Sequence, residues 1–109
     1  MQRILIPMSV NLPENQQRTD NSTDLAEPRQ YRVLLHNDHY TTMEFVVQVL
    51  ETVFNKTPAE ATQIMLHVHK RGVGVCGVYA AEIAETKVAM VHHLAREHKY
   101  PLKCSMEEA

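Results

Sequence analysis

Residues 31–54 decide the fold and read YRVLLHNDHYTTMEFVVQVLETVF. Residues 31–35 are rich in β-formers and are followed by the turn signal Asn37-Asp38, so they are predicted to form a strand. A helix is predicted to begin at Thr41, because Thr41 and Glu44 have the spacing of a capping box. The apolar residues that follow recur at helical spacing and share one face, namely Met43, Val46, Val47, Leu50, Val53 and Phe54. The stretch therefore predicts a strand, a turn and an amphipathic helix in that order.

A second helix is predicted directly after the first. Thr57 and Glu60 have the spacing of another capping box, with Pro58 at the first helical position. Gly72 stands where a C-cap glycine would end this helix. Its buried face is expected to comprise Ala61, Ile64, Met65 and Val68.

The rest of the chain is predicted to add a strand at residues 73–79, a helix at residues 81–98 and a short strand at residues 102–106. Ala80 occupies the cap position of the third helix and lacks a side chain that can cap it. The apolar face of this helix is expected to be Ile83, Ala84, Val88, Val91, Leu94 and Ala95. The order β-α-α-β-α-β predicts a compact α+β sandwich, with three helices on one face of a three-stranded antiparallel or mixed sheet.

The 109 residues suit a single domain preceded by an arm. Between residues 10 and 30 the only apolar residues are Val10, Leu12, Leu25 and Ala26. Such a stretch buries too little surface to offset the entropy of ordering its backbone. Residues 1–30 are therefore expected to be a flexible N-terminal extension, and residues 31–109 the folded domain.

Charge and composition exclude several classes of protein. A net charge of −2 excludes a basic chain that binds nucleic acid by neutralising phosphates. No apolar run approaches the roughly 20 residues of a membrane helix, and the patch at residues 4–6 is too short for a secretory signal. Cys76 and Cys104 are too few for a disulfide framework and suit a reducing compartment. We expect a cytoplasmic protein that binds neither nucleic acid nor membrane.

Seven histidines raise the question of a metal site. His67 and His69 are two residues apart, which places them about 200° apart on a helix. His92 and His93 are about 100° apart, and there is no Cys-x-x-Cys to complete a zinc site. Solvated surface histidines, with no metal and no cofactor, are therefore the expected outcome. A His-rich metal-binding domain remains the alternative.

The sequence also lacks the usual signatures of an enzyme. There is no Gly-x-Ser-x-Gly elbow, and its three glycines do not form a phosphate-binding loop. Cys76 lies inside an apolar strand, where a thiol is unreactive. No catalytic residue is predicted.

One group of residues could form a binding site. Asn37 and Asp38 leave the first strand, and His69 ends the second helix. If that helix packs beside the strand, an amide oxygen, a carboxylate and an imidazole converge beside an apolar wall. That wall would comprise Met43, Val46, Met65 and Val68, which fit a pocket or an ordinary core equally well. The pattern alone indicates a small binding module without identifying its ligand.

The sequence resembles the ClpS adaptors over nearly all of residues 31–109. The resemblance lies in four blocks, in order: the strand, turn and helix of residues 31–46, then residues 61–69, then residues 76–79 with 84–91, and residues 101–104. Such adaptors are not enzymes. They bind proteins whose first residue is Leu, Phe, Tyr or Trp and deliver them to the AAA+ unfoldase ClpA of the ClpAP protease.

The resemblance implies a role for individual residues. Asn37, Asp38 and His69 would accept hydrogen bonds from the free α-amino group of the bound protein. Glu82 and Lys87 would dock on the N-terminal domain of the unfoldase, and the adaptor would be a monomer. The pocket for the first side chain would be lined by Leu35, Thr41, Met43, Val46, Met65, Val68 and Leu102.

Three positions depart from the family pattern. His39 stands where Asp is common, Thr42 replaces a frequent Pro, and Ala80 replaces a frequent Thr cap. A third interpretation also stays open, that of an interaction domain resembling a ribosomal stalk domain, with the same fold and no pocket.

Overall fold

The computed structural model describes residues 28–109, so the expected flexibility of residues 1–27 falls outside the described part of the chain. The elements are β2 (Gln30–His36), α1 (Met43–Thr52), α2 (Pro58–Arg71), β3 (Val73–Ala80), α3 (Ala81–Glu97) and β4 (Lys103–Glu108). The predicted order β-α-α-β-α-β is confirmed. Within residues 28–109, no helix is both long and apolar enough to cross a membrane.

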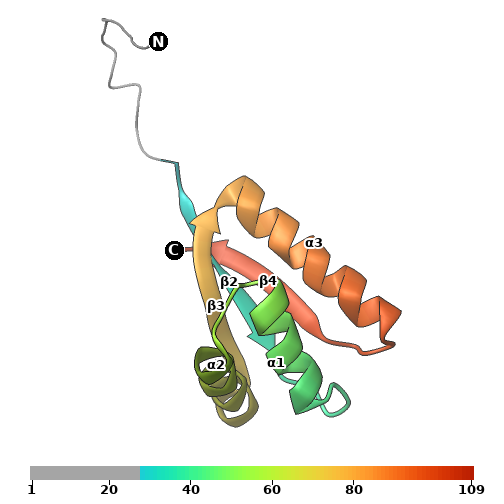
Figure 1. Cartoon of the computed structure of the whole chain (residues 1–109). Coiled ribbons are helices and arrows are strands. Elements are labelled where there is room, and N and C mark those ends of the chain that lie inside the picture. Colours follow the sequence, from blue (N-terminus) through green and yellow to red (C-terminus); the bar gives the residue numbers. More distant parts are fainter. Residues whose placement is uncertain (1–27) are drawn as a thin grey trace, which may run out of the picture.

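The three strands form one antiparallel sheet in the order β3-β2-β4. Of the two predicted sheet types, antiparallel is therefore the one observed. The helices lie against one face of the sheet (Figure 1). Val33 and Leu35 of β2 are fully buried against them, whereas Arg32 and Leu34 point to the opposite face and are half-buried. The central strand thus separates a helix-covered face from an open face.

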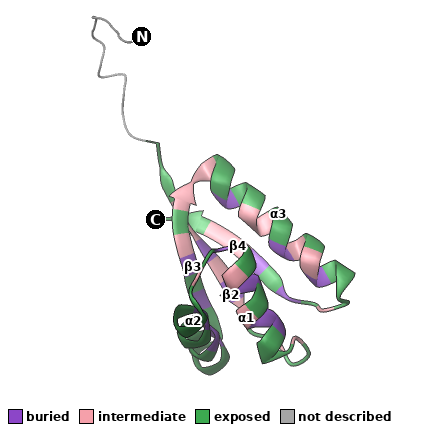
Figure 2. Cartoon of the chain, in the orientation of Figure 1, coloured by how far each residue is buried: buried purple, intermediate pink, exposed green. Residues whose placement is uncertain are grey.

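The core lies where the helices meet the sheet (Figure 2). Its largest fully buried side chains are Leu35, Leu50, Val33, Val49, Val53, Val91 and Cys76. Each aliphatic side chain of this size contributes about 1.5–3 kcal/mol on burial. The core also includes Phe45 and Val49, which the predicted face of the first helix left out.

The predicted start of α1 is wrong by one residue. The N-cap is Thr42, whose side-chain oxygen accepts a hydrogen bond from the Phe45 N–H. The Thr41 hydroxyl instead donates to Asp38 Oδ2 at 2.7 Å, so Thr41 and Glu44 form no capping box. The carboxylate of Asp38 is the stronger acceptor for this hydroxyl because it is charged.

The ends of α2 match the prediction. The Glu60 N–H donates to Thr57 Oγ1, and the Thr57 N–H donates back to the Glu60 carboxylate at 3.0 Å. The hydrogen bonds that the Glu60 carboxylate accepts from Thr57, above all from its backbone N–H, lower the pKa of Glu60. At the other end Gly72 adopts φ 90° and its N–H donates to the Val68 carbonyl.

The third helix follows β3 without a break and has no side-chain cap at Ala80, as predicted. Ile83 was expected on its buried face but is exposed. Ala84, Val91 and Ala95 define the buried stripe, and Ile83 lies about 100° from it around the helix. His92 of this helix accepts the Cys104 N–H through Nε2 at 3.0 Å, which ties α3 to β4.

Candidate functional site

The turn after β2 is built around the carboxylate of Asp38. Its Oδ1 accepts the N–H groups of Tyr40 at 2.8 Å and Thr41 at 2.7 Å, while Oδ2 accepts the Thr41 hydroxyl. Partial burial raises the pKa of Asp38, but the hydrogen bonds from Thr41 and Tyr40 outweigh it. The net pKa lies below the ordinary value, so the carboxylate is negatively charged at neutral pH.

The preceding residue connects this turn to the end of α2. The Asn37 N–H donates to the Gly72 carbonyl at 2.8 Å. Gly72 in turn caps the last turn of α2, in which His69 lies. One backbone hydrogen bond therefore places the loop after β2 beside the helix end that carries His69, and this link could not be inferred from either segment alone.

A cavity of about 230 Å³ opens between these two segments. The structure brings together all three predicted polar residues and five of the seven predicted apolar-pocket positions around it. His39, one of the three positions that depart from the family pattern, was not among the named site residues and is a further member. The lining residues are Asn37, Asp38, His39, Thr41, Met43, Val46, Met65, Val68 and His69.

Leu35 and Leu102 do not line this cavity. Both were expected in the pocket, and both are buried in the core. Leu35 belongs to the face of β2 that the helices cover, and Leu102 directly precedes β4. Both residues belong to the hydrophobic core rather than to the cavity lining.

The rim of the cavity is polar and its wall is apolar. Asn37 and His69 are exposed, and neither side chain has a hydrogen-bond partner among residues 28–109. Val46, Met65 and Val68 form the buried wall. An amide oxygen, an imidazole nitrogen and a carboxylate can all accept hydrogen bonds. The arrangement suits a ligand that carries a cationic donor group next to an apolar side chain.

The histidines do not form a metal centre. Within residues 28–109, no three His, Cys, Asp or Glu side chains are placed to hold a metal ion, so the metal-binding alternative has no support there. Several histidines have other contacts. His36 Nε2 lies 2.6 Å from Ser105 Oγ, and His93 pairs with Glu97 at 3.2 Å. His36 and His92 thus link β2 to β4 and α3 to β4, whereas His93 pairs within α3 and stays largely exposed, as a surface histidine was expected to.

The two residues expected to dock on an unfoldase differ in their surroundings. Glu82 is exposed in the first turn of α3. Lys87 is half-buried, and its Nζ donates to the Val53 carbonyl at 2.8 Å while lying 5.2 Å from the centre of the Tyr79 ring. Lys87 thus holds the C-terminal end of α1, a role for which the sequence offered no local signal.

The chain is similar to known proteins of one family. The family model of the ATP-dependent Clp protease adaptor protein ClpS matches residues 26–105. The ClpS adapter protein of Syntrophus aciditrophicus is 66% identical over 84 residues, which are 77% of this chain and 78% of the relative. That of Desulforapulum autotrophicum is 57% identical over 103 residues, which are 93% of this chain and 99% of the relative.

A solved structure shares the fold. It is Agrobacterium tumefaciens ClpS2 bound to L-phenylalaninamide, which is 36% identical with a TM-score of 0.74. The match covers 76% of this chain and all of that protein. The sheet, the helices and the matched sequence lead to one conclusion: the chain belongs to the ClpS family, the adaptor proteins of the ATP-dependent Clp protease.

Proposed function

We propose that this adaptor binds the free N-terminus of proteins that begin with Leu, Phe, Tyr or Trp and delivers them to a ClpA-type AAA+ unfoldase. The observation that carries the proposal is the cavity, in which Asn37, Asp38 and His69 surround the mouth of an apolar hole. The adaptor itself performs no chemistry on the bound protein.

Recognition of the N-terminus follows from the chemistry of the rim. An α-ammonium group has three N–H donors and a positive charge, and removing it from water is costly unless each donor finds an acceptor. Asn37 and His69 offer acceptors without a competing partner among residues 28–109. Asp38 supplies the opposite charge, and its turn contacts leave about one of its four lone-pair sites for a ligand.

An internal residue of a protein lacks both the charge and two of the three donors. It would leave the acceptors of Asn37 and His69 unpaired, which is the most effective way for a polar site to reject an analogue. The rim therefore selects chain ends over internal sequence.

The size of the cavity supports recognition of one side chain. At about 230 Å³ it is smaller than the roughly 300–1,000 Å³ of sites for drug-sized ligands. Met43 and Met65 on its wall can adjust to branched and planar side chains alike. The ligand of the Agrobacterium relative, L-phenylalaninamide, combines a free α-amino group with one aromatic side chain, which is the chemistry that this cavity suits.

A peptide titration tests this proposal. A fluorescent peptide that begins with Leu or Phe should bind with micromolar or better affinity, and its N-acetylated form at least about 100-fold more weakly. Asn37→Ala and His69→Ala should each weaken binding by roughly tenfold or more, because each removes a hydrogen bond to a charged group. His67→Ala is the matched control, since this histidine of α2 does not line the cavity. Equal binding of free and acetylated peptides would contradict the proposal.

Delivery requires a second surface, which we place at the start of α3. The exposed Glu82 side chain can contact the unfoldase directly. Lys87 Nζ donates to the Val53 carbonyl, so Lys87 fixes the position of α3 against the end of α1. Glu82→Lys should weaken binding of the isolated N-terminal domain of a ClpA-type unfoldase, as measured by calorimetry. Glu97→Lys is the matched control, because it lies on the same helix about 22 Å away. Equal affinities of the two variants for the unfoldase domain would exclude an unfoldase-binding surface at the start of α3.

A further inference from the structure

One polar residue at the mouth of the cavity is not used in recognising the chain end. His39 lines the cavity, is exposed and directly follows Asp38 in the turn after β2. Within residues 28–109, the histidines whose rings take part in a hydrogen bond or an ion pair are His36, His92, His93 and His98. The His39 ring has no such partner there, so it is available to a ligand.

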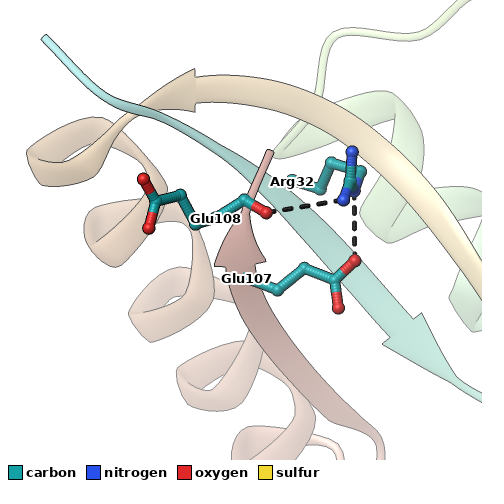
Figure 3. A network of polar contacts seen from close by, with 3 residues as sticks. All are labelled: Arg32, Glu107 and Glu108. Carbon is teal, nitrogen blue, oxygen red and sulfur yellow. Dashed lines mark hydrogen bonds and ion pairs between the residues drawn. The ribbon is translucent and has the colours of Figure 1, made fainter.

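The charged side chains at one end of the sheet are paired with one another. Arg32 Nε donates to Glu107 Oε2 at 3.1 Å, and Arg32 Nη2 donates to the Glu108 carbonyl at 3.4 Å (Figure 3). The Glu108 carboxylate also lies 3.6 Å from Arg29 Nε. These charges balance one another within the chain, in contrast to the basic groups beside the cavity.

Basic side chains without an ion-pair partner lie beside the cavity. His69, Lys70 and Arg71 occupy the last turn of α2, and all three are exposed. None of them takes part in an ion pair within residues 28–109. Of the residues that line the cavity, Asp38 alone carries a carboxylate, and the next acidic residue along the chain, Glu44, does not line it. Once an α-ammonium group has balanced Asp38, the remaining charge at the mouth is mainly positive.

The geometry of an amino acid decides which part of a substrate meets His39. Its tetrahedral Cα directs the amino group, the side chain and the carbonyl along different bonds. In the proposed function, on which this inference rests, the amino group lies at Asn37, Asp38 and His69 while the side chain fills the apolar hole. The carbonyl and the second residue must then leave past the rest of the rim. Because the Thr41 hydroxyl is engaged with Asp38, His39 is the polar lining residue left to meet them.

An imidazole in this position distinguishes acidic from basic side chains. A neutral ring donates one hydrogen bond, and a protonated ring donates two. A carboxylate nearby favours the protonated ring, and the hydrogen bond between the two is then charge-assisted. A lysine or arginine can only donate to the neutral ring, and its charge opposes protonation. A second residue with a carboxylate is therefore favoured at His39 over one with a basic side chain.

We propose that His39 contacts the side chain of the second residue of the substrate and makes this adaptor prefer Asp or Glu there. The preferred substrates are chain ends in which Leu, Phe, Tyr or Trp is followed by an acidic residue. Lys70 and Arg71 add to the preference through their charge, and His39 supplies the direct contact. The site thus selects two residues of the substrate rather than one.

Fluorescence anisotropy with three peptides tests the proposal. The peptides are identical except that their first residue, Leu, is followed by Glu, Gln or Lys. The Glu peptide should bind about threefold more tightly than the Gln peptide, as expected for a largely exposed ion pair, and the Lys peptide should bind most weakly. His39→Asp should bring the affinity of the Lys peptide level with that of the Glu peptide or above it. His67→Asp makes the same change at an exposed residue of α2 that does not line the cavity, and it should keep the parent order.

The outcomes separate this inference from the proposed function. If the parent binds all three peptides equally but still rejects their N-acetylated forms, the inference is wrong and the proposed function stands. If acetylation makes no difference to binding, both are wrong. An unchanged order of affinities in His39→Asp, or the same change of order in His67→Asp, would assign the preference to the surrounding charge instead of His39 and overturn the inference.

Discussion

The Asn37 N–H donates a 2.8 Å hydrogen bond to the Gly72 carbonyl, and this bond joins the two segments that flank the candidate site. Asn37 follows β2, whereas Gly72 ends the helix that carries His69. Gly72 can hold this position because φ 90° is open to glycine without steric cost. The spacing of the rim residues thus depends on the backbone geometry of a residue that contacts no ligand.

Gly72→Ala should therefore impair both stability and binding. No atom lies within 4 Å of an added Cβ, so the cost is that of a left-handed alanine, about 1–2 kcal/mol in the free energy of unfolding. Affinity for a Leu-initiated peptide should fall several-fold because the turn that carries His69 shifts. Gly72→Asn should restore much of both, since Asn tolerates this conformation. Denaturant unfolding measures the stability and peptide anisotropy the affinity. Equal stability and affinity of Gly72→Ala and Gly72→Asn would contradict the explanation.

Thr41→Val should loosen the turn at Asp38. The variant keeps the shape of the side chain but removes the 2.7 Å hydrogen bond to Oδ2. A hydrogen bond to a charged group at a partly exposed site is worth about 1 kcal/mol. The pKa of Asp38 should rise, because one contact that favours the charged form is lost. Carboxyl carbon NMR during acid titration reports this pKa, and an unchanged value would show that the hydroxyl is not its cause.

Asp38 also makes a pH-dependent contribution to stability. Its pKa is lowered in the folded state, so folding favours the ionised form. This contribution is complete above the unfolded pKa of about 3.9 and disappears as the pH falls through the folded value. The gap in unfolding free energy between the parent and Asp38→Asn should therefore be constant above about pH 5 and shrink below about pH 4. Urea unfolding across this pH range measures the difference in unfolding free energy. A difference that grows as the pH falls would contradict the prediction.

Met43 should matter for binding and not for stability. It lines the cavity with 44% of its surface exposed, whereas Met90 on α3 is equally exposed, at 42%, and lies away from the site. Met43→Ala and Met90→Ala should each change stability by no more than about 0.5 kcal/mol. Only Met43→Ala should weaken binding of a Phe-initiated peptide, by several-fold. Parallel loss of affinity in Met90→Ala would show that the effect does not arise in the cavity.

Neither native cysteine should react in the folded protein. Burial raises the pKa of Cys104 to about 12 and raises that of Cys76 as well, so almost no thiolate exists at neutral pH. A thiol reagent should modify both cysteines only after denaturation. Gln48→Cys, at an exposed position of α1, should react at once and serves as the positive control. Rapid modification of the parent would mean that the core opens readily.

Local patterns predicted most of the fold, because helix caps and apolar periodicity are properties of short segments. The cap at Thr57 and Glu60 is confirmed, because both reciprocal hydrogen bonds of the capping box are present. The cap at Thr41 is not, because the adjacent Asp38 carboxylate takes its hydroxyl and leaves Thr42 as the N-cap. Because Thr41 and Thr42 are adjacent, which of them caps the helix depends on the turn at Asp38, and the sequence pattern does not show that turn.

The sequence predicted which residues form the candidate site but not the contacts that these residues make. Asn37, Asp38 and His69 do meet at one cavity, yet the engagement of Asp38 in its own turn could not be inferred from spacing. Contacts between distant residues were beyond sequence reasoning in the same way. The bond from Lys87 to Val53 and that from Cys104 to His92 each join segments whose proximity is set by packing.

The proposed binding of a free N-terminus depends on whether Asn37, Asp38 and His69 recognise an α-ammonium group. The most direct measurement compares L-phenylalaninamide with 3-phenylpropanamide, which has the same ring and amide but no amino group, as competitors of a bound fluorescent peptide. L-Phenylalaninamide should displace the peptide, and 3-phenylpropanamide should be at least about 100-fold weaker because it leaves the acceptors of Asn37 and His69 unpaired. Equal displacement by the two compounds would contradict the account.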